Sequence, residues 1–354
     1  MAGTSDLPRG FACALLAAGL AAMSCSSLGH RTVRDDQFNY GAAIASASAE
    51  QLLMNMVRLR YDVPPVFLTV SSVISQYRQS TSLSLRAGLG TSATGDDTGS
   101  VGVGAVWVDR PTITYTPVTG RDFARTFLTP LQPQQIFALL QSGWPADLVV
   151  RLSLVSINGV KNEVSRPARR QLADPAFWEL MEVMRRLREA SALATRPSPE
   201  GSDSGASLFL RDEDVTPDIA ADQKRFRELL SLGSGQHDFR LTAGLIAERA
   251  GDIAVLTRSI RDIMLNLAWR FDVPPEHVTE GRTAESFVSP APLIQVHFAD
   301  SRPSEAYVAV ESRGIWFYID DRDRTSKRAF SFLHMLLSLT ETPEPGLGPI
   351  LSIN

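Results

Sequence analysis

The stretch TSLSLRAGLGTSATGDDTGSVGVGAVWV, residues 81–108, decides the architecture of the N-terminal half of this chain. On both sides of its centre, apolar residues alternate with serine, glycine or arginine, which is the period-two pattern of a β-strand with two unlike faces. The centre, Gly90 to Ser100, is rich in glycine, serine, threonine and aspartate and predicts a long turn. The stretch therefore predicts a β-hairpin, and Thr112 to Thr116 predict a third strand after Pro111. The alternating apolar positions are Leu83, Leu85, Ala87, Leu89, Val101, Val103, Ala105 and Trp107.

A closed monomeric core explains this hairpin poorly, because Arg86 is the one charged residue in its alternating strands. We expect a second protomer or a partner protein to cover its apolar residues Leu83, Leu85, Val103 and Trp107. An alternative is that the hairpin is one protomer's share of an oligomeric hairpin barrel in the outer membrane, whose strands need ~9 to 11 residues each. The glycines do not form a phosphate-binding loop, because no Gly-Lys-Ser/Thr follows them.

Amphipathic helices surround the hairpin in sequence. Over Tyr40 to Tyr61 the apolar residues return every three or four positions, which predicts a helix that Pro64-Pro65 end. Asp174-Pro175 supply an N-cap and a first-turn proline for a second helix through Leu193. Short strands and a helix over Ser326 to Leu339 follow. This order predicts an α+β fold with antiparallel sheets and packed amphipathic helices. The apolar stripe of the first helix consists of Ala45, Ala49, Leu52, Met56 and Leu59.

The chain is predicted to form two α+β units. The first spans residues 39–165 and carries the hairpin; it ends with a strand over Leu148 to Ile157 and a tight turn at Asn158-Gly159. The second spans residues 170–354 and includes a Pro/Gly/Ser-rich linker over Thr195 to Ala206.

One hexapeptide occurs twice in nearly the same form. Arg60 to Pro65 and Arg270 to Pro275 differ only at their second residue, tyrosine in one and phenylalanine in the other. Each follows an amphipathic pattern, and the pattern before the second copy predicts a helix over Val255 to Phe271. The similarity stops at the prolines. We interpret it as two helices that use the same stop signal, with a duplicated half as the alternative.

The first 24 residues have the layout of an export signal. Arg9 precedes an apolar stretch from Phe11 to Met23, which is too short to cross a bilayer as a helix. Cys13 lies inside that stretch, so cleavage leaves Cys25 without a partner for a disulfide. Because exported proteins seldom keep one unpaired thiol, we expect Cys25 to carry a lipid. Residues 25–38 are short of apolar residues and predict a tether.

The four residues Ala22-Met23-Ser24-Cys25 resemble the lipobox of bacterial lipoproteins, although Ala22 stands where leucine is usual. Three further segments are similar to a family of uncharacterised bacterial lipoproteins: Gln51-Leu52-Leu53, Val57 to Tyr61 and Arg110 to Pro117. The resemblance implies a signal peptide over residues 1–24 and a Cys25 that bears three acyl chains, palmitate among them. Because Ser26 follows the cysteine, it also implies the outer membrane, with the protein facing the periplasm. It implies no activity.

Signatures of chemistry are sparse. The net charge of -4 gives no reason to expect nucleic acid as a partner. We predict no catalytic, cofactor-binding or metal-binding residues, since the histidines have no metal-ligand spacing and no serine lies in a nucleophile motif. His334 is expected to be a structural histidine on the last helix. The cluster Asp320-Asp321-Arg322-Asp323 is expected to connect a strand to that helix, with Asp323 at the helix N-terminus; a divalent cation site is the alternative.

Two functional hypotheses follow. The first is a lipid-anchored cell-envelope protein with a structural, scaffold or assembly role, which contacts the membrane through its lipidated N-terminus and a partner protein or further copies of itself through its surface. The second is an envelope enzyme or small-ligand receptor whose site is dispersed along the sequence. The second requires a deep pocket with converging polar groups, and the first does not.

Overall fold

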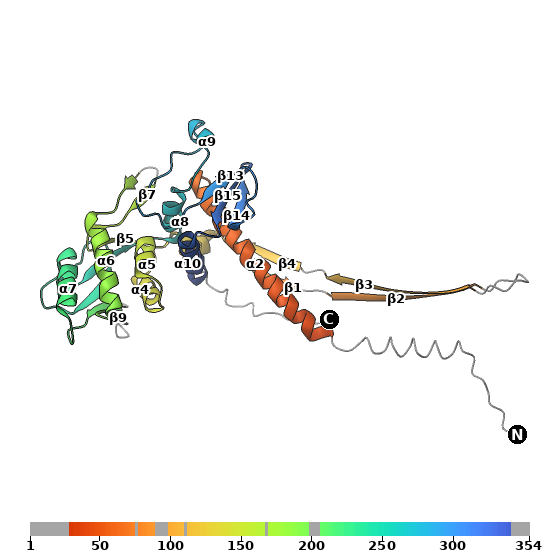
Figure 1. Cartoon of the computed structure of the whole chain (residues 1–354), viewed down its shortest axis with the longest axis horizontal. Coiled ribbons are helices and arrows are strands. Elements are labelled where there is room, and N and C mark those ends of the chain that lie inside the picture. Colours follow the sequence, from red (N-terminus) through yellow and green to blue (C-terminus); the bar gives the residue numbers. More distant parts are fainter. Residues whose placement is uncertain are drawn as a thin grey trace, which may run out of the picture.

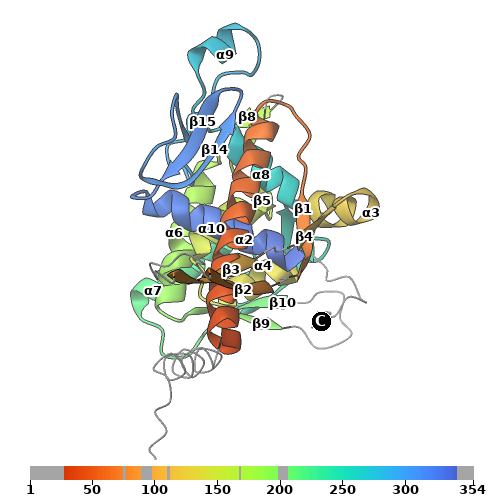
Figure 2. The ribbon, with the colours of Figure 1, turned by 90° about the vertical axis from the view of Figure 1, so that its right-hand side faces the viewer.

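The computed structural model describes residues 28–74, 77–88, 98–109, 112–166, 169–197 and 206–340. Helices and sheets gather in a body, and two features leave that body on the same side: the N-terminal half of helix α2 and a two-stranded ribbon, β2 and β3 (Figure 1). Figure 2 looks at that side and shows β2 and β3 nearly end-on beside α2. The fold class is α+β, as the sequence predicted.

Helix α2 (Leu28–Arg60) has 33 residues, which corresponds to a length of about 50 Å. Its C-terminal half enters the body and is buried on nearly all sides from Leu52 onward. Its N-terminal half is exposed where side chains are described, so Ala45 does not continue the buried stripe that the sequence predicted. The helix also begins within the segment predicted as a tether over residues 25–38. Most of the described side chains in this half are exposed, so it has no apolar stripe by which periodicity could find it.

The ribbon extends from a shorter antiparallel pair of strands, which we call its base. At its base, β1 (Leu68–Ile74) pairs with β4 (Thr112–Pro117), and the last pair is Ile74 with Thr112. Farther out, β2 (Tyr77–Gly88) pairs with β3 (Thr98–Asp109), and the first pair is Tyr77 with Asp109. Two residues on each chain separate these pairs, so the outer ladder continues the register of the inner one. The predicted hairpin and third strand are thus confirmed, while the tip, residues 89–97, lies outside the described residues.

A six-stranded sheet forms the centre of the body, in the order β6-β5-β12-β11-β10-β9. Its ladders are antiparallel except that between β11 and β12, which is parallel. Asn158 and Gly159 both have positive φ at the turn between β5 and β6, as predicted for a tight hairpin. The sheet draws strands from both predicted units. The strands are β5 (Leu154–Ile157), β6 (Val160–Lys161), β9 (Leu193–Pro197), β10 (Ala206–Leu210), β11 (Asp238–Ala243) and β12 (Ile253–Thr257).

Helices pack on this sheet and on α2. Helix α4 contacts β9, β10 and β11, α6 contacts β9 and α7, and α8 contacts α2. These helices are α3 (Gly120–Phe123), α4 (Pro133–Gln141), α5 (Ala146–Ser153), α6 (Pro175–Glu189), α7 (Pro217–Leu229), α8 (Ile260–Ala268) and α9 (Pro275–Thr279), with a π-helical turn, η1 (Ala124–Leu128), after α3. The short pair β7 (Val164–Arg166) and β8 (Arg169–Gln171) lies beside α8.

A second sheet of three strands, in the order β13-β15-β14, lies against α2 (Figure 1). It consists of β13 (His297–Ala299), β14 (Ala306–Ser312) and β15 (Ile315–Asp320), and α10 (Arg324–Thr340) follows it. Apolar residues of α2, both sheets and the packed helices form one hydrophobic cluster. The buried end of α2 thus belongs to the same core as the two sheets and contacts β14 and α8.

Two local expectations were wrong. Residues 148–153 are helical in α5, and the predicted strand begins only at Leu154. The helix predicted over Val255 to Phe271 begins at Ile260, because Val255 belongs to β12. Of the predicted linker over Thr195 to Ala206, the described ends belong to β9 and β10, which pair with each other, and residues 198–205 lie outside the described residues. For residues 148–153 and 255–259, an apolar run belongs to another element of the packed core than the one predicted, a choice that periodicity alone does not make.

Candidate functional site

Two amide side chains of α2 hold the base of the ribbon. Asn55 Nδ2 donates to the Val66 carbonyl at 2.7 Å, and the Val66 N–H donates to Asn55 Oδ1 at 2.8 Å. One turn earlier on the helix, Gln51 makes the same two bonds with Leu68: the Leu68 N–H donates to Oε1 at 2.5 Å, and Nε2 donates to the Leu68 carbonyl at 3.0 Å. We call these four residues the mount.

Both amides can bind the same extended segment because one turn of a helix and two residues of an extended chain have nearly equal length. Four residues of a helix rise about 6 Å, and two residues of an extended chain advance about 6.6 Å. Amides at positions i and i+4 of α2 therefore reach alternate residues of the chain that enters β1. Each amide side chain donates one hydrogen bond to this backbone and accepts one from it, as a neighbouring β-strand would. The sequence analysis missed this role; its signal was a pair of amides four residues apart in a helix otherwise rich in buried apolar residues.

We expect Asn55→Ala to destabilise the protein and loosen the mount. Asn55 is 1% exposed, and its loss removes the partner of the Val66 N–H and carbonyl from a part-buried site. Such a loss costs about 1–3 kcal/mol. Urea unfolding measures the stability, and hydrogen exchange at the Val66 amide reports the mount. Gln134→Ala, at an exposed amide of α4, is the control. An unchanged exchange rate at Val66 would contradict the role of Asn55.

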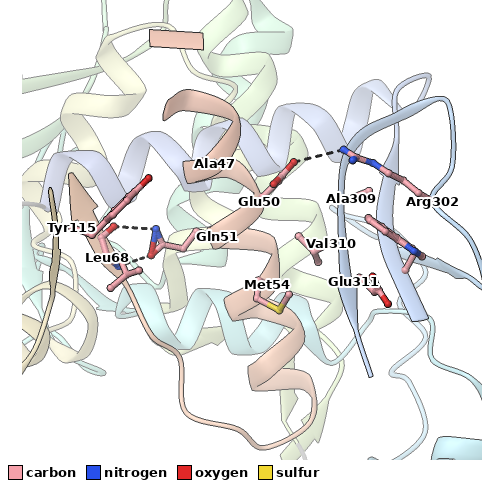
Figure 3. Close-up of a pocket in the computed structure, with 11 residues that line it drawn as sticks. Ala47, Glu50, Gln51, Met54, Leu68, Tyr115, Arg302, Ala309, Val310 and Glu311 are labelled. Carbon is pink, nitrogen blue, oxygen red and sulfur yellow. Dashed lines mark hydrogen bonds and ion pairs between the residues drawn. The ribbon is translucent and has the colours of Figure 1, made fainter. Parts of the chain in front are cut away.

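A groove of about 420 Å³ lies over α2, between the ribbon base and the three-stranded sheet (Figure 3). Its floor is helical and includes Glu50 and Met54, while Tyr115 of β4 stands on one side and Trp316 of β15 on the other. Arg302 lies 5.4 Å from the centre of the Trp316 ring and 3.8 Å from Glu50. The groove is open along its length and mixes apolar surface with one ion pair. This arrangement suits contact with a peptide segment better than chemistry on a small substrate.

The buried end of α2 carries the first copy of the repeated hexapeptide. The guanidinium of Arg60 lies 4.4 Å from the centre of the Trp269 ring and donates to Thr283 and to the Ala284 carbonyl. Burial lowers the pKa of Arg60 to about 10. Asp62 then takes φ 56°, and the helix ends. The arginine thus ties the end of α2 to the chain beyond α9.

Next to it, Tyr61 and His277 form a second tie. The Tyr61 hydroxyl lies 2.7 Å from Nδ1 of His277, and both residues are buried. Burial, with the positive charge of Arg282, lowers the pKa of His277 below its ordinary value. A neutral histidine in contact with a tyrosine could suggest acid–base chemistry. Neither residue lines the groove over α2, so we assign the pair to the packing of α2 against α9.

The second copy of the hexapeptide is also bound inside the body. Arg270 pairs with Glu163, and both side chains are 4% exposed. Ser289 Oγ donates to Glu163 at 2.8 Å, and Arg270 Nε donates to the Asn266 carbonyl at 3.2 Å. Burial lowers the pKa of Arg270, and the charge of Glu163 opposes that shift. The two hexapeptides therefore share a buried arginine near a helix end, and each arginine has its own set of partners.

Arg258 is buried as well and serves a helix terminus. Its guanidinium donates to the carbonyls of Arg151 and Leu152, in the last turn of α5, at 3.0 and 3.2 Å, and to that of Glu163 at 2.5 Å. Burial lowers its pKa to about 9. A cation at the C-terminus of a helix satisfies carbonyls that have no partner within the helix. We therefore regard Arg258 as structural.

The two polar expectations near the C-terminus are confirmed. His334 Nε2 lies 2.8 Å from Ser48 Oγ and joins α10 to α2. Asp323 accepts from the backbone N–H groups of Thr325 and Ser326, both at 3.0 Å, and so supports the start of α10. The strand-to-helix connection is thus the role that the structure assigns to this acidic segment.

Cys25 lies outside the described residues, and α2 begins three residues after it. No group of three or more histidine, cysteine, aspartate or glutamate side chains in the described part of the chain could hold a metal ion. Among the helices searched there, none is both long enough and apolar enough to cross a membrane.

Comparison with known proteins gave no match: no family model, no curated protein and no solved structure is significantly similar to this chain.

Proposed function

We propose that this protein is a lipid-anchored component of the cell envelope that acts as a scaffold or assembly factor through contacts made by β2 and β3, which we call the arm. The observation that carries the proposal is the isolation of the arm. Its two strands have 12 residues each, about 40 Å of extended chain, and within the described residues they pair only with each other. An isolated two-stranded ribbon is marginally stable in water, so a contact surface elsewhere is expected to stabilise it.

The direction of the arm supports a role at a membrane. The arm and the start of α2 leave the body on the same side (Figures 1 and 2). Cys25, the expected lipid attachment site, is three residues before α2. A lipid there would place the arm next to the bilayer from which the protein is anchored. Outer-membrane location with the body in the periplasm is part of this proposal.

The alternative, an envelope enzyme or small-ligand receptor, finds less support. It requires a deep pocket in which polar groups converge. The groove over α2 is open, and its ion pair joins Arg302 to Glu50 rather than pointing into an enclosed space. The groups with lowered pKa that we describe above hold helix ends and buried connections.

Deletion of the arm tests the proposal. Ser80 pairs with Val106, so residues 81–105 can be replaced by Asn-Gly, which favours a tight turn, without change to the register of the base. We expect the lipidated full chain, cross-linked in cells and purified from membranes, to bring down further protein that the deletion variant loses. A shortened connection over residues 198–205, between β9 and β10, is the control. Identical co-purified protein with and without the arm, at an equal urea unfolding midpoint, would refute the proposal.

A further inference from the structure

Several edges of the sheets in the body are protected. Gln51 occupies the edge of β1 at Leu68, and β14 is packed along α2. At the ends of the six-stranded sheet, β6 has only two residues, while β9 ends at Pro197 and its Thr195 carbonyl accepts from Gln141. These are the devices by which proteins prevent a strand edge from pairing with another chain.

The arm has none of these devices. Its strands contain no proline, and Arg78, Arg86 and Asp109 are their charged residues. Its two outer edges have the same length and pair with no other described strand. Because the same chain shields several edges of its body, the open edges of the arm indicate a surface that another strand completes.

We propose that the outer edge of β2 in one copy of this protein pairs with the outer edge of β3 in a second copy, so that the arms of several copies form one continuous antiparallel sheet. This inference rests on the proposed function and names the partner as the chain itself. A foreign strand would complete one edge and leave the other open. A second arm offers an edge of matching length, and repetition of the same contact completes both edges of every arm inside the assembly.

The polarity of the strands agrees with the expected anchor. β2 runs away from the body and β3 returns to it, so β2 of one copy and β3 of its neighbour are antiparallel when both arms point the same way (Figure 1). All bodies then lie at the same end of the shared sheet, as they must if every copy is anchored to the same membrane. An edge contact between two β2 strands would instead direct the two bodies to opposite ends.

The register within the arm also favours extension from copy to copy. Leu83 pairs with Val103 and Leu85 with Val101, whereas Ser82 pairs with Gly104. In this central part of the arm apolar residues meet apolar residues and serines meet glycines, whereas nearer the base Gln79 pairs with Trp107 and Ser80 with Val106. A neighbouring arm in the equivalent register continues each row, and like pairs in adjacent rows stabilise a sheet.

Lysine substitution on the arm tests the contact. The variant is Ser82→Lys/Ser84→Lys; the register places glycines opposite both positions, so the substitution meets no cross-strand side chain in its own ribbon. The control, Ser234→Lys/Ser301→Lys, adds the same charge at exposed serines of the body. We expect the full chain and the control, extracted in mild detergent, to sediment as oligomers, and the arm variant to sediment as a monomer with an unchanged urea unfolding midpoint.

Cysteine cross-linking identifies the edges that meet. In a Cys13→Ala/Cys25→Ser chain, one copy carries Ser82→Cys and a co-expressed, differently tagged copy carries Gly104→Cys. We expect a bismaleimide to join unlike copies in preference to like ones. Oligomers that survive the lysine substitutions, preferential linkage of two Ser82→Cys copies, or a monomeric full chain would each overturn the inference. A monomer that still captures a foreign protein through its arm would leave the proposed function intact, whereas a chain without any arm-dependent contact would overturn both.

Discussion

Glu163→Gln is expected to destabilise this protein by about 3–5 kcal/mol, because it removes the carboxylate that pairs with the buried Arg270. Arg270 is 8% exposed and would retain its positive charge without a counter-charge. A loss of this size is comparable to the entire stability of many domains. The urea unfolding midpoint measures the effect, and circular dichroism shows whether the variant still folds at 25 °C.

Two further variants separate the pair from charge in general. Glu182→Gln removes a carboxylate that faces solvent beside Arg185, and we expect no measurable shift in the midpoint. Glu163→Gln/Arg270→Met replaces both charges with neutral side chains of similar size and should recover much of the lost stability, since the desolvated charge is then gone. Equal midpoints for Glu163→Gln and the unaltered protein would show that the pair contributes little.

Cys25→Ala is expected to move most of the protein from the membrane fraction to the soluble fraction. One acyl chain gives marginal membrane binding, and two or more hold a protein stably. Cell fractionation followed by a salt wash measures the change. Cys13→Ala is the matched control, because Cys13 lies within the expected signal peptide and should leave the distribution unchanged.

The same measurement separates the anchor from the arm. If Cys25→Ala protein stays with the membrane after export and a salt wash, the lipid is not the main attachment. Release of that protein only after residues 81–105 are also replaced would assign the remaining attachment to the arm.

The sequence alone predicted the elements whose pattern is local. Period-two alternation on both sides of a glycine-rich centre was sufficient for the ribbon, and the register of β2 and β3 agrees with it. Prolines at helix ends and the Asn158-Gly159 turn were equally informative, because each acts on its own backbone through φ or a missing N–H. The roles of Asp323 and His334 also followed from their positions on the last helix.

Only the tertiary structure decided what these elements contact. Gln51 and Asn55 are ordinary amides in the sequence. They bind Leu68 and Val66 because the chain that enters β1 returns along the face of α2 that carries them. Glu163 and Arg270 are 107 positions apart, and no local pattern links them. The N-terminal half of α2 escaped detection for the opposite reason: most of its described side chains are exposed, so it has no apolar stripe to detect. Local backbone preferences are determined by neighbouring residues, whereas strand pairing, burial and exposure depend on where distant segments of the chain meet.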